Sequence, residues 1–202
     1  MDVRDVLTAH KEEGVYYRTD HHWTSLGAFL CYQQYADAAG LGQVTAEDYT
    51  VTTVTEDFRG SLYSKILDYD SAYDSIQIYE KTGTNTSFVI TLDGEETDDF
   101  YQYDKLEEKD QYLFFLGGNY SEVVVQKEAS DGERNLLLVK DSFANAFVPF
   151  VAEDFDNVYM IDLRYFRGNM EEYMETNNIT DVLVLYNVSN FISDKNMHKL
   201  NK

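Results

Sequence analysis

The sequence predicts an α/β protein with a parallel central sheet, flanking helices and a β-rich insertion. After residue 134, three short apolar runs rich in branched side chains alternate with helical stretches. Such alternation is typical of parallel strands that are joined by crossover helices. Between residues 44 and 126, short runs rich in Thr, Tyr, Val and Phe are broken by Gly or Asp, which is typical of strands and turns. We therefore assign residues 44–126 to the insertion.

The composition is that of a folded globular protein. The chain has 202 residues, of which 44% are hydrophobic and 15% aromatic, and this is enough for one sizeable core. We predict a single domain over residues 1–202. The formal net charge of -21, without a basic patch, excludes binding to nucleic acid phosphates. Cys31 is the one cysteine of the sequence, so an intrachain disulfide and a thiolate zinc cluster are excluded.

The N-terminal part predicts a helix, a short strand, a turn and a second helix. These lie in residues 3–11, 15–17, 20–23 and 26–37. Gly14 is placed to end the first helix. Thr24 or Ser25 can cap the second helix, and Gly40 closes it.

The rest of the chain predicts strands in the insertion and then an alternation of strands and helices. Strands are expected at 51–54, 75–79, 87–92, 135–139, 157–161 and 181–185, and helices from Ser142 and at 169–177. Asp93 and Gly94 are a strong turn signal, whereas residues 98–112 receive no assignment. Ligand sites of open α/β sheets lie beyond the carboxyl ends of the strands, so we expect the site near Ser142, 162–165 and 186–190.

Residues 20–23, Asp-His-His-Trp, contain two of the four histidines. In an extended segment Asp20 and His22 would project to one side and His21 to the other. Asp20 would then orient the His22 imidazole, and His22 would act as a general base. We expect a structural hydrogen bond for His21 and packing under the next helix for Trp23. A cluster of this kind also suits a metal ion such as manganese.

Ser142 follows the apolar run 136–139 at the junction of a strand and a helix. This position would expose the hydroxyl and direct the backbone amide of Ser142 at an oxyanion, an arrangement that suits acyl transfer. A serine that only caps the helix fits the same pattern. The Asp-His motif at residues 20–22 favours a nucleophilic role for Ser142 over a capping role.

Residues 19–24, Thr-Asp-His-His-Trp-Thr, resemble the signature of the bacterial DHHW protein family. That family is similar to the SGNH-hydrolase-like domains of alginate O-acetylation proteins. The likeness continues through residues 26–28, 58–61, 115–119 and 161–166. Lys140 departs from it, because the usual Gly-Asp-Ser motif has glycine at this position.

The resemblance implies an SGNH-like fold and a catalytic triad. The order Asp20, His22, Ser142 is permuted relative to ordinary SGNH esterases. Further candidates are Ser142, Gly118 and Asn119 as oxyanion donors, and Arg164, Tyr165 and Tyr186 as contacts to substrate. A loop role for Gly118 and Asn119 and a salt bridge for Arg164 are open alternatives.

The resemblance also implies the activity and the setting. It indicates a serine-dependent O-acetyltransferase or O-acetylesterase that acts on cell-envelope or extracellular polysaccharide without a metal or other cofactor. Its partners would be a carbohydrate polymer, an acyl donor and a membrane-bound acyltransferase. We expect the full-length protein to be extracytoplasmic, membrane-anchored or secreted, and the present chain to lack an N-terminal part.

Two other functions compete with this one. The first is a metal-dependent phosphoesterase that uses the Asp-His-His segment as ligands. The second is a non-catalytic carbohydrate-binding subunit with the same fold.

Overall fold

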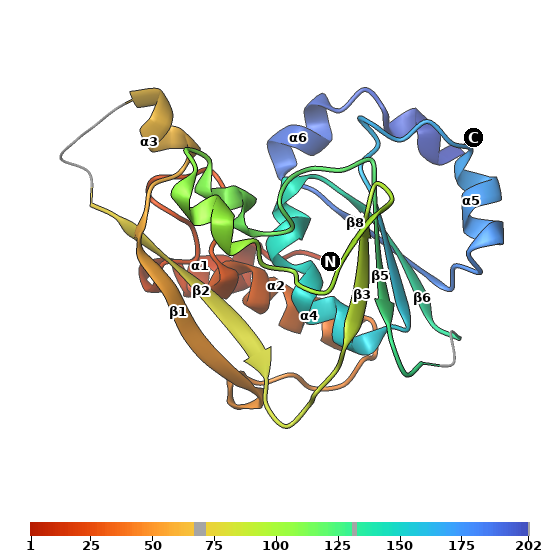
Figure 1. Cartoon of the computed structure of the whole chain (residues 1–202), viewed down its shortest axis with the longest axis horizontal. Coiled ribbons are helices and arrows are strands. Elements are labelled where there is room, and N and C mark those ends of the chain that lie inside the picture. The colour runs from red at the N-terminus through yellow and green to blue at the C-terminus, as the bar shows by residue number, and fades with distance from the viewer. Residues whose placement is uncertain (67–71, 131–132, 202) are drawn as a thin grey trace. The chain divides into compact units, whose positions relative to one another are not determined.

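Six strands form one mixed sheet in the computed structural model, which describes residues 1–66, 72–130 and 133–201 (Figure 1). The strands are β3 (Phe88–Leu92), β4 (Glu95–Thr97), β5 (Glu122–Lys127), β6 (Asn135–Lys140), β7 (Asn157–Ile161) and β8 (Asp181–Leu185), in the order β4-β3-β5-β7-β6-β8. Strand β6 is parallel to β7 and to β8, as predicted. The other pairs, β3 with β4, β3 with β5 and β5 with β7, are antiparallel. The parallel pairing predicted for the three strands after residue 134 is therefore correct, and three strands from the segment assigned to the β-rich insertion extend the same sheet with antiparallel pairs.

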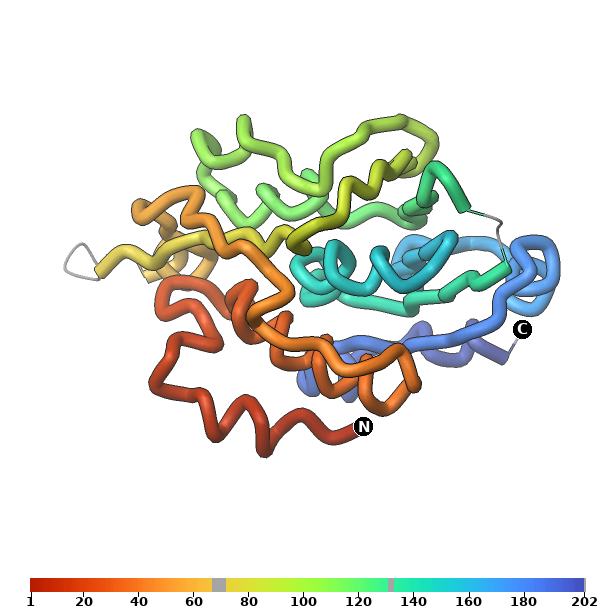
Figure 2. Tube along the Cα trace, turned by 90° about the horizontal axis from the view of Figure 1, so that it is seen from below, coloured from red at the N-terminus to blue at the C-terminus, as the bar shows by residue number. Residues whose placement is uncertain are grey.

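Strand β6 is buried along its whole length because neighbours cover both of its edges and both of its faces. The chain leaves β6 through η5 (Ser142–Ala146), α4 (Val148–Val151) and η6 (Ala152–Asp154) and returns as β7 on one side of β6. It then passes through α5 (Met170–Thr176) to β8 on the other side. Right-handed crossovers in opposite directions place α4 and α5 on opposite faces of the sheet, as Figure 1 shows. Figure 2 follows the same path from teal to blue.

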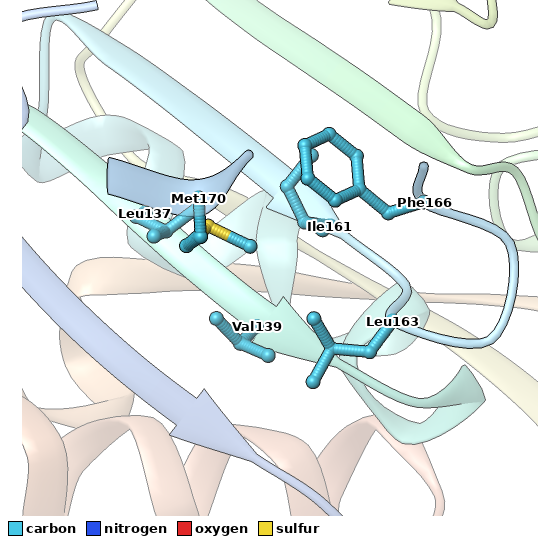
Figure 3. Packing of buried hydrophobic residues seen from close by; sticks show 6 residues of the cluster. All are labelled: Leu137, Val139, Ile161, Leu163, Phe166 and Met170. Carbon is cyan, nitrogen blue, oxygen red and sulfur yellow. The ribbon is translucent and has the colours of Figure 1, made fainter. Parts of the chain in front are cut away.

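The face of the sheet under α5 has its own hydrophobic cluster (Figure 3). Its buried members are Leu137, Val139, Ile161, Leu163, Phe166 and Met170. Alternate residues of β6 and β7 point to this face, and Met170 reaches it from the first turn of α5. Asn169 caps that helix by accepting a hydrogen bond from the Glu172 amide at 2.9 Å.

The β-rich segment 44–126 divides between two sheets. Strands β1 (Tyr49–Phe58) and β2 (Asp74–Lys81) form an antiparallel pair of their own, whereas β3, β4 and β5 extend the six-stranded sheet. Asp93 and Gly94, both with positive φ, form the predicted turn between β3 and β4. The unassigned residues 98–112 contain the 3-10 helix η3 (Tyr103–Glu107) and the first half of a second one, η4 (Gln111–Phe114).

The chain consists of two compact units. The first comprises Met1–Asn85 and Tyr101–Gly117, and the second comprises Thr86–Phe100 and Gly118–Lys202. The six-stranded sheet and its helices, including α6 (Val188–Ser193) and η7 (Met197–Asn201), belong to the second unit. That both units form the single domain expected for residues 1–202 stays a prediction.

The first unit is built on helix α2 (Ser25–Ala38). Its other elements are α1 (Arg4–Ala9), η1 (Lys11–Glu13), η2 (Ala46–Asp48), β1, α3 (Ser61–Ile66), β2, η3 and η4. Phe29 of α2 packs against Tyr49 and Tyr79 of the β1-β2 pair, with ring centroids 5.1 and 5.2 Å apart. Thr24 caps α2, as predicted, by accepting a hydrogen bond from the Gly27 amide.

Across residues 1–66, 72–130 and 133–201, no helix combines the length and the apolar character that a membrane crossing requires.

Removing side-chain volume from β6 tests how much this strand contributes to the free energy of unfolding. Leu138 is fully buried, so we expect Leu138→Ala to lower the free energy of unfolding by about 2–5 kcal/mol, through lost apolar burial and a cavity. Val182→Ala on β8 is the control, because Val182 is 52% exposed, and it should cost less than about 1 kcal/mol. Urea unfolding followed by circular dichroism measures both. Equal losses would contradict the central position of β6.

Candidate functional site

Asp20 and His22 form a buried hydrogen-bonded pair in the first unit. The Nδ1 atom of His22 lies 2.6 Å from Oδ1 of Asp20, and the backbone amide of His22 donates to the same oxygen at 2.9 Å. Both residues are nearly inaccessible to solvent, at 2% and 5% exposed. Because Nδ1 carries the proton towards the carboxylate, Nε2 is the basic nitrogen of the ring.

The pairing was expected, but it arises in another way. Residues 18–22 form a bend, not an extended strand. The hydrogen bond from the His22 amide closes an Asx turn, in which the Asp20 side chain bonds to the backbone two residues further on. The turn brings the two side chains together without strand geometry.

The ionised form of Asp20 is favoured by its hydrogen bonds. Burial by itself would raise the pKa of the carboxyl, but hydrogen bonds from His22 and from the Ser61 amide outweigh that effect and hold the pKa well below its usual range. The Ser61 amide donates to Oδ2 at 2.6 Å. Asp20 is therefore a permanent negative charge beside the imidazole at neutral pH.

Tyr112 holds the imidazole from one face. Its ring is stacked on that of His22, with centroids 3.6 Å apart and parallel planes. Tyr112 is 5% exposed and belongs to η4, within the segment that the sequence left unassigned. The one signal in the sequence was the aromatic content of residues 98–112, which does not identify a partner.

Residues 59–61 leave no space around Asp20. The Gly60 amide donates to Oγ1 of Thr19 at 3.2 Å, next to the contact from the Ser61 amide. A Cβ atom at Gly60 would collide with Cβ and Oδ2 of Asp20. Glycine at this position is therefore a requirement of the close approach, and the resemblance noted at residues 58–61 has a physical basis.

Asp74 holds the residue that precedes the motif. Its Oδ2 accepts from the amide and from the hydroxyl of Thr19, at 2.8 and 2.6 Å. Thr19 in turn accepts backbone hydrogen bonds from Leu62 and Tyr63. The strand β2 and the helix α3 thus meet on one threonine next to Asp20.

His21 does not point away from the pair, contrary to expectation. Its ring lies over that of His22, with centroids 3.9 Å apart, and its Nδ1 is 3.3 Å from Oδ1 of Asp20. The expected structural hydrogen bond is present, since Nδ1 of His21 is 2.9 Å from Oγ of Ser61. Trp23 is buried, and its Cβ would touch a Cβ built at Gly27 of the next helix.

The same three residues offer a set of metal-ligand atoms. One atom each from Asp20, His21 and His22 lies within 4.8 Å of the others. However, Oδ1 of Asp20 already accepts two N–H groups of His22, and Oδ2 accepts the Ser61 amide. A cation would have to replace these bonds, so the donor set suits an orienting carboxylate better than a ligand.

Ser142 lies in the second unit, directly after β6 and at the start of η5. Asp141 is buried and caps this turn by accepting from the Phe143 amide at 2.9 Å. Its other oxygen accepts from the amide of Asn187 at 2.9 Å and from Nδ2 of Asn190 at 2.7 Å. Asp141 therefore fixes the backbone on both sides of the serine to the start of α6.

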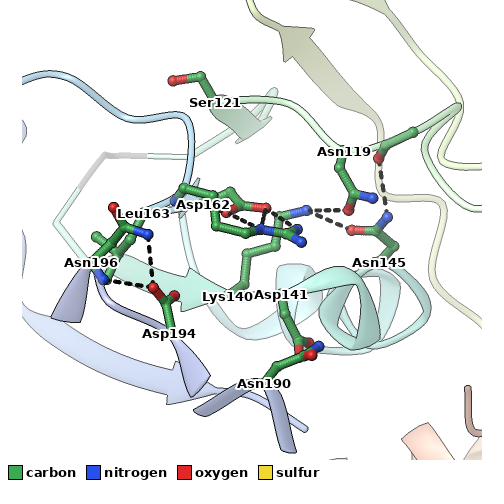
Figure 4. A network of polar contacts seen from close by, with 12 residues as sticks. Asn119, Ser121, Lys140, Asp141, Asn145, Asp162, Leu163, Asn190, Asp194 and Asn196 are labelled. Carbon is green, nitrogen blue, oxygen red and sulfur yellow. Dashed lines mark hydrogen bonds and ion pairs between the residues drawn. The ribbon is translucent and has the colours of Figure 1, made fainter. Parts of the chain in front are cut away.

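The oxyanion candidates Gly118 and Asn119 are tied to the same turn, and Figure 4 shows Asn119 and Asn145 beside Lys140. Asn145 of η5 donates through Nδ2 to the Gly118 carbonyl at 3.1 Å. Lys140, at the end of β6, donates to Oδ1 of Asn145 at 2.8 Å and lies 3.5 Å from Oδ1 of Asn119. The sequence placed Lys140 as a departure from a motif and did not identify it as a contact.

Two of the three substrate candidates share a pocket. It has a volume of about 390 Å³ and is lined by Asp141, Arg164, Tyr186, Asn190, Ser193, Asp194, Lys195 and Asn196. Arg164 also forms the salt bridge that the sequence left open, because its Nε donates to Oδ1 of buried Asp162 at 2.9 Å. Burial and the nearby Asp194 raise the pKa of Tyr186, so its hydroxyl keeps its proton. Tyr165 is half exposed and does not line the pocket.

The predicted site residues thus occur in two groups. The first unit contains Asp20 and His22, and the second contains Ser142 with Gly118, Asn119 and the pocket. In the first unit Asp20 and His22 are hydrogen-bonded to each other, and in the second unit Gly118 and Asn119 are tied to the turn that begins at Ser142. A triad that joins the two units stays a prediction.

Comparisons with known proteins show similarity in both sequence and structure. The sequence model of the DHHW protein family matches residues 2–161. A DHHW family protein from Eubacterium siraeum has a similar structure, with a TM-score of 0.77 and 26% identity over 99% of this chain and 67% of that chain. Two structures of Bacillus cereus PatB1, one with a sulfonyl adduct, have TM-scores of 0.75 and 0.74, with 27% and 28% identity over 94% and 92% of this chain and 68% and 66% of theirs. This chain spans about two thirds of each of these proteins. No curated protein matches it.

Substitution of Gly60 tests the close approach to Asp20. We expect Gly60→Ala to lower the free energy of unfolding by about 1–3 kcal/mol, because the added methyl group must displace the carboxylate. The low-field Nδ1 proton of His22 in the NMR spectrum should shift or disappear. Gly42→Ala is the control, because a Cβ there meets nothing within 4 Å. Gly42 has positive φ, so this variant can lose stability through backbone strain, but it should leave the Nδ1 proton of His22 unchanged. An unchanged Nδ1 proton of His22 in Gly60→Ala would contradict the close approach of Gly60 to the Asp20 carboxylate.

Asp20 should make stability depend on acid pH. The folded protein holds the pKa of Asp20 below the value of 3.8 that the carboxyl has without these contacts, so the unfolded chain binds the proton first as pH falls. The stabilisation is complete above pH 3.8 and is lost progressively below it. We expect the unfolding free energy of Asp20→Asn to fall less steeply between pH 5 and pH 2 than that of the wild type. Asp5→Asn, at an exposed carboxylate on α1, should retain the wild-type slope in urea titrations.

Proposed function

This chain belongs to the DHHW protein family, and we propose that it is a serine-dependent O-acetyltransferase or O-acetylesterase that acts on cell-envelope or extracellular polysaccharide. The observation that carries the proposal is the Asp20–His22 pair, buried, 2.6 Å apart and stacked on Tyr112. Such a pair is the orienting half of a hydrolytic triad. Ser142, in the strand-to-helix turn after β6, is the nucleophile of the proposal.

In the proposed reaction, Nε2 of His22 accepts the hydroxyl proton of Ser142 while Oγ attacks the acetyl carbonyl of a donor. The tetrahedral oxyanion collapses, the bond to the leaving group breaks, and the imidazolium returns its proton to that group. Asp20 stabilises the imidazolium during both steps. A sugar hydroxyl or water then attacks the acetyl-serine, with His22 again as the base, and the free serine is restored.

The sulfonyl adduct of PatB1 supports a nucleophile of this kind. Sulfonyl adducts form when an activated side chain attacks an electrophilic sulfur. PatB1 is 27% identical to this chain over 94% of this chain and 68% of PatB1, and we carry the chemistry over as part of the proposal.

The pocket of the second unit suits a carbohydrate. Its lining offers neutral donors and acceptors from Asn190, Ser193 and Asn196 together with the Arg164 guanidinium, and it includes Tyr186, whose hydroxyl is buried. Groups of this type hydrogen-bond to sugar hydroxyls and to a carboxylate. The guanidinium carbon of Arg164 lies 5.3 Å from the ring centroid of Tyr165, and this ring offers a stacking surface for a sugar outside the pocket lining.

The setting belongs to the same proposal. The partners are a carbohydrate polymer and an acyl donor, supplied by a membrane-bound acyltransferase, and the full-length protein acts outside the cytoplasm. The net charge of -21 is consistent with the exclusion of nucleic acid.

A single substitution tests the proposal. We expect Ser142→Ala to lower kcat for p-nitrophenyl acetate by about 10⁴-fold or more, as loss of a triad serine does elsewhere. The variant should also lose the mass increase that phenylmethylsulfonyl fluoride produces on the wild type. Ser189→Ala, at an exposed serine of α6, is the control and should behave as the wild type. Transfer of acetyl to an added oligosaccharide separates a transferase from an esterase.

Other results would favour the competing functions. Retained turnover in Ser142→Ala, together with loss of phosphoester hydrolysis after dialysis against EDTA, would indicate a metal-dependent phosphoesterase. The ligand atoms of Asp20, His21 and His22 within 4.8 Å of one another are the observation that favours it. Oligosaccharide binding without turnover or sulfonyl labelling would indicate a non-catalytic carbohydrate-binding subunit.

A further inference from the structure

Lys140 is a buried lysine directly before the Asp141-Ser142 turn. Its side chain is completely inaccessible, at 0% exposed, although β6 is otherwise an apolar strand apart from Asn135. Lysine is almost never fully buried unless polar groups replace its water. A leucine or methionine would fill the same space without that cost, so the contacts of the ammonium call for an explanation.

The contacts of Lys140 join three segments of the second unit. Its Nζ donates to Oδ1 of Asn145 in η5 and lies 3.5 Å from Oδ1 of Asn119, in the loop before β5. Asn145 in turn donates to the Gly118 carbonyl of that loop. Figure 4 shows the side chains of Asn119 and Asn145 on the same ammonium.

An ammonium group determines the orientation of a side-chain amide. It has three donors and no acceptor, so only the oxygen of an asparagine can face it. The oxygen of Asn119 is then directed at Lys140, and its NH2 group is directed away. Asn119 is exposed, which leaves that NH2 group accessible to a ligand. An apolar side chain at position 140 would not determine whether the oxygen or the NH2 group of Asn119 faces it.

We propose that Lys140 is a positioning residue that assembles the oxyanion hole, by directing the NH2 group of Asn119 towards the carbonyl oxygen that Ser142 attacks. The inference rests on the proposed acyl-transfer function and adds a role that the serine, histidine and aspartate do not fill. Preorganised donors of this kind stabilise the charge that develops on the oxygen, and loss of one donor typically lowers kcat by about 10²–10³-fold.

The carboxylates near Lys140 are bonded to other groups. Among the residues that the structure describes, no carboxylate forms an ion pair with Nζ. Asp162 is bonded to Arg164, Asp141 caps the serine turn, and Asp93 accepts from the Ser121 and Glu122 amides. Burial lowers the pKa of Lys140 to about 8, Asp162, Asp141 and Asp93 raise it, and Arg164 lowers it. The ammonium therefore loses its proton in an accessible pH range.

The pH dependence separates positioning from a purely structural role. Above about pH 8 the folded protein releases the Lys140 proton, whereas the unfolded chain keeps it up to about pH 10.5. The contribution of Lys140 to stability therefore rises between these two pH values. Activity should fall over the same range because the neutral amine has an acceptor lone pair as well as donors, so it no longer excludes the orientation in which the NH2 group of Asn119 faces it. A structural role would make stability and activity change together.

The test uses the full chain and the variants Lys140→Met, Asn119→Ala and the double variant. We expect Lys140→Met to lower kcat for p-nitrophenyl acetate by about 10²-fold with little change in KM, and to lose the alkaline limb near pH 8. The double variant should be no slower than the slower single variant, since both changes remove one donor. Lys127→Met is the control, because Lys127 of β5 bonds to the Glu153 carbonyl instead.

A second measurement does not depend on turnover. In the ¹⁵N NMR spectrum, the side-chain NH2 signals of Asn119 should titrate near pH 8 in the wild type and not in Lys140→Met. Absence of this titration overturns the proposal, as does Lys140→Met with wild-type kcat when Ser142→Ala is inactive. If Ser142→Ala remains active, the proposed function fails and the oxyanion role of Lys140 fails with it, even where the NH2 signals titrate.

Discussion

The buried carboxylate of Asp20 is the interaction on which the architecture around the His22 imidazole depends. A charge removed from water is tolerated only where hydrogen bonds replace the lost solvent. Here three N–H groups do so, two from His22 and one from Ser61. Each donor requires a particular backbone path, and Gly60 is the residue that lets one of these paths come close enough. The Tyr112 ring then closes the remaining face of the imidazole.

The second unit meets a similar constraint at the end of β6. A strand covered on both faces is normally apolar throughout, yet its last residue is a lysine whose ammonium has amide oxygens as its hydrogen-bond partners within the described part of the chain. The neighbouring Asp141 is also buried and has its oxygens occupied by amides of η5 and α6. The serine turn is therefore held by two buried side chains, that of Lys140 at the end of the strand and that of Asp141 directly after it.

In the proposed reaction the two units have different tasks. The first unit supplies the general base, because the oriented imidazole of His22 can accept the proton of the serine and return it to the leaving group. The second unit supplies the nucleophile and manages negative charge, because the amides that are organised by Lys140 can stabilise an oxyanion. Each task requires rigid groups in a site that excludes water, and burial of Asp20, Lys140 and Asp141 is the structural cost of that rigidity.

Local patterns in the sequence were sufficient for the parallel strands, for the Thr24 cap, for the Asp93-Gly94 turn and for the Asp20–His22 pairing. All of these depend on residues within a few positions of one another, where spacing fixes geometry. Even the error about an extended segment left the pairing intact, because an Asx turn also joins residues two apart. The antiparallel strands of the sheet, the Tyr112 stack and the partners of Lys140 were not predictable in this way. Ser61 reaches Asp20 across 41 residues and Asn119 reaches Lys140 across 21. Contacts over such separations are set by how the whole chain packs, since no local propensity specifies which distant amide a buried charge will meet.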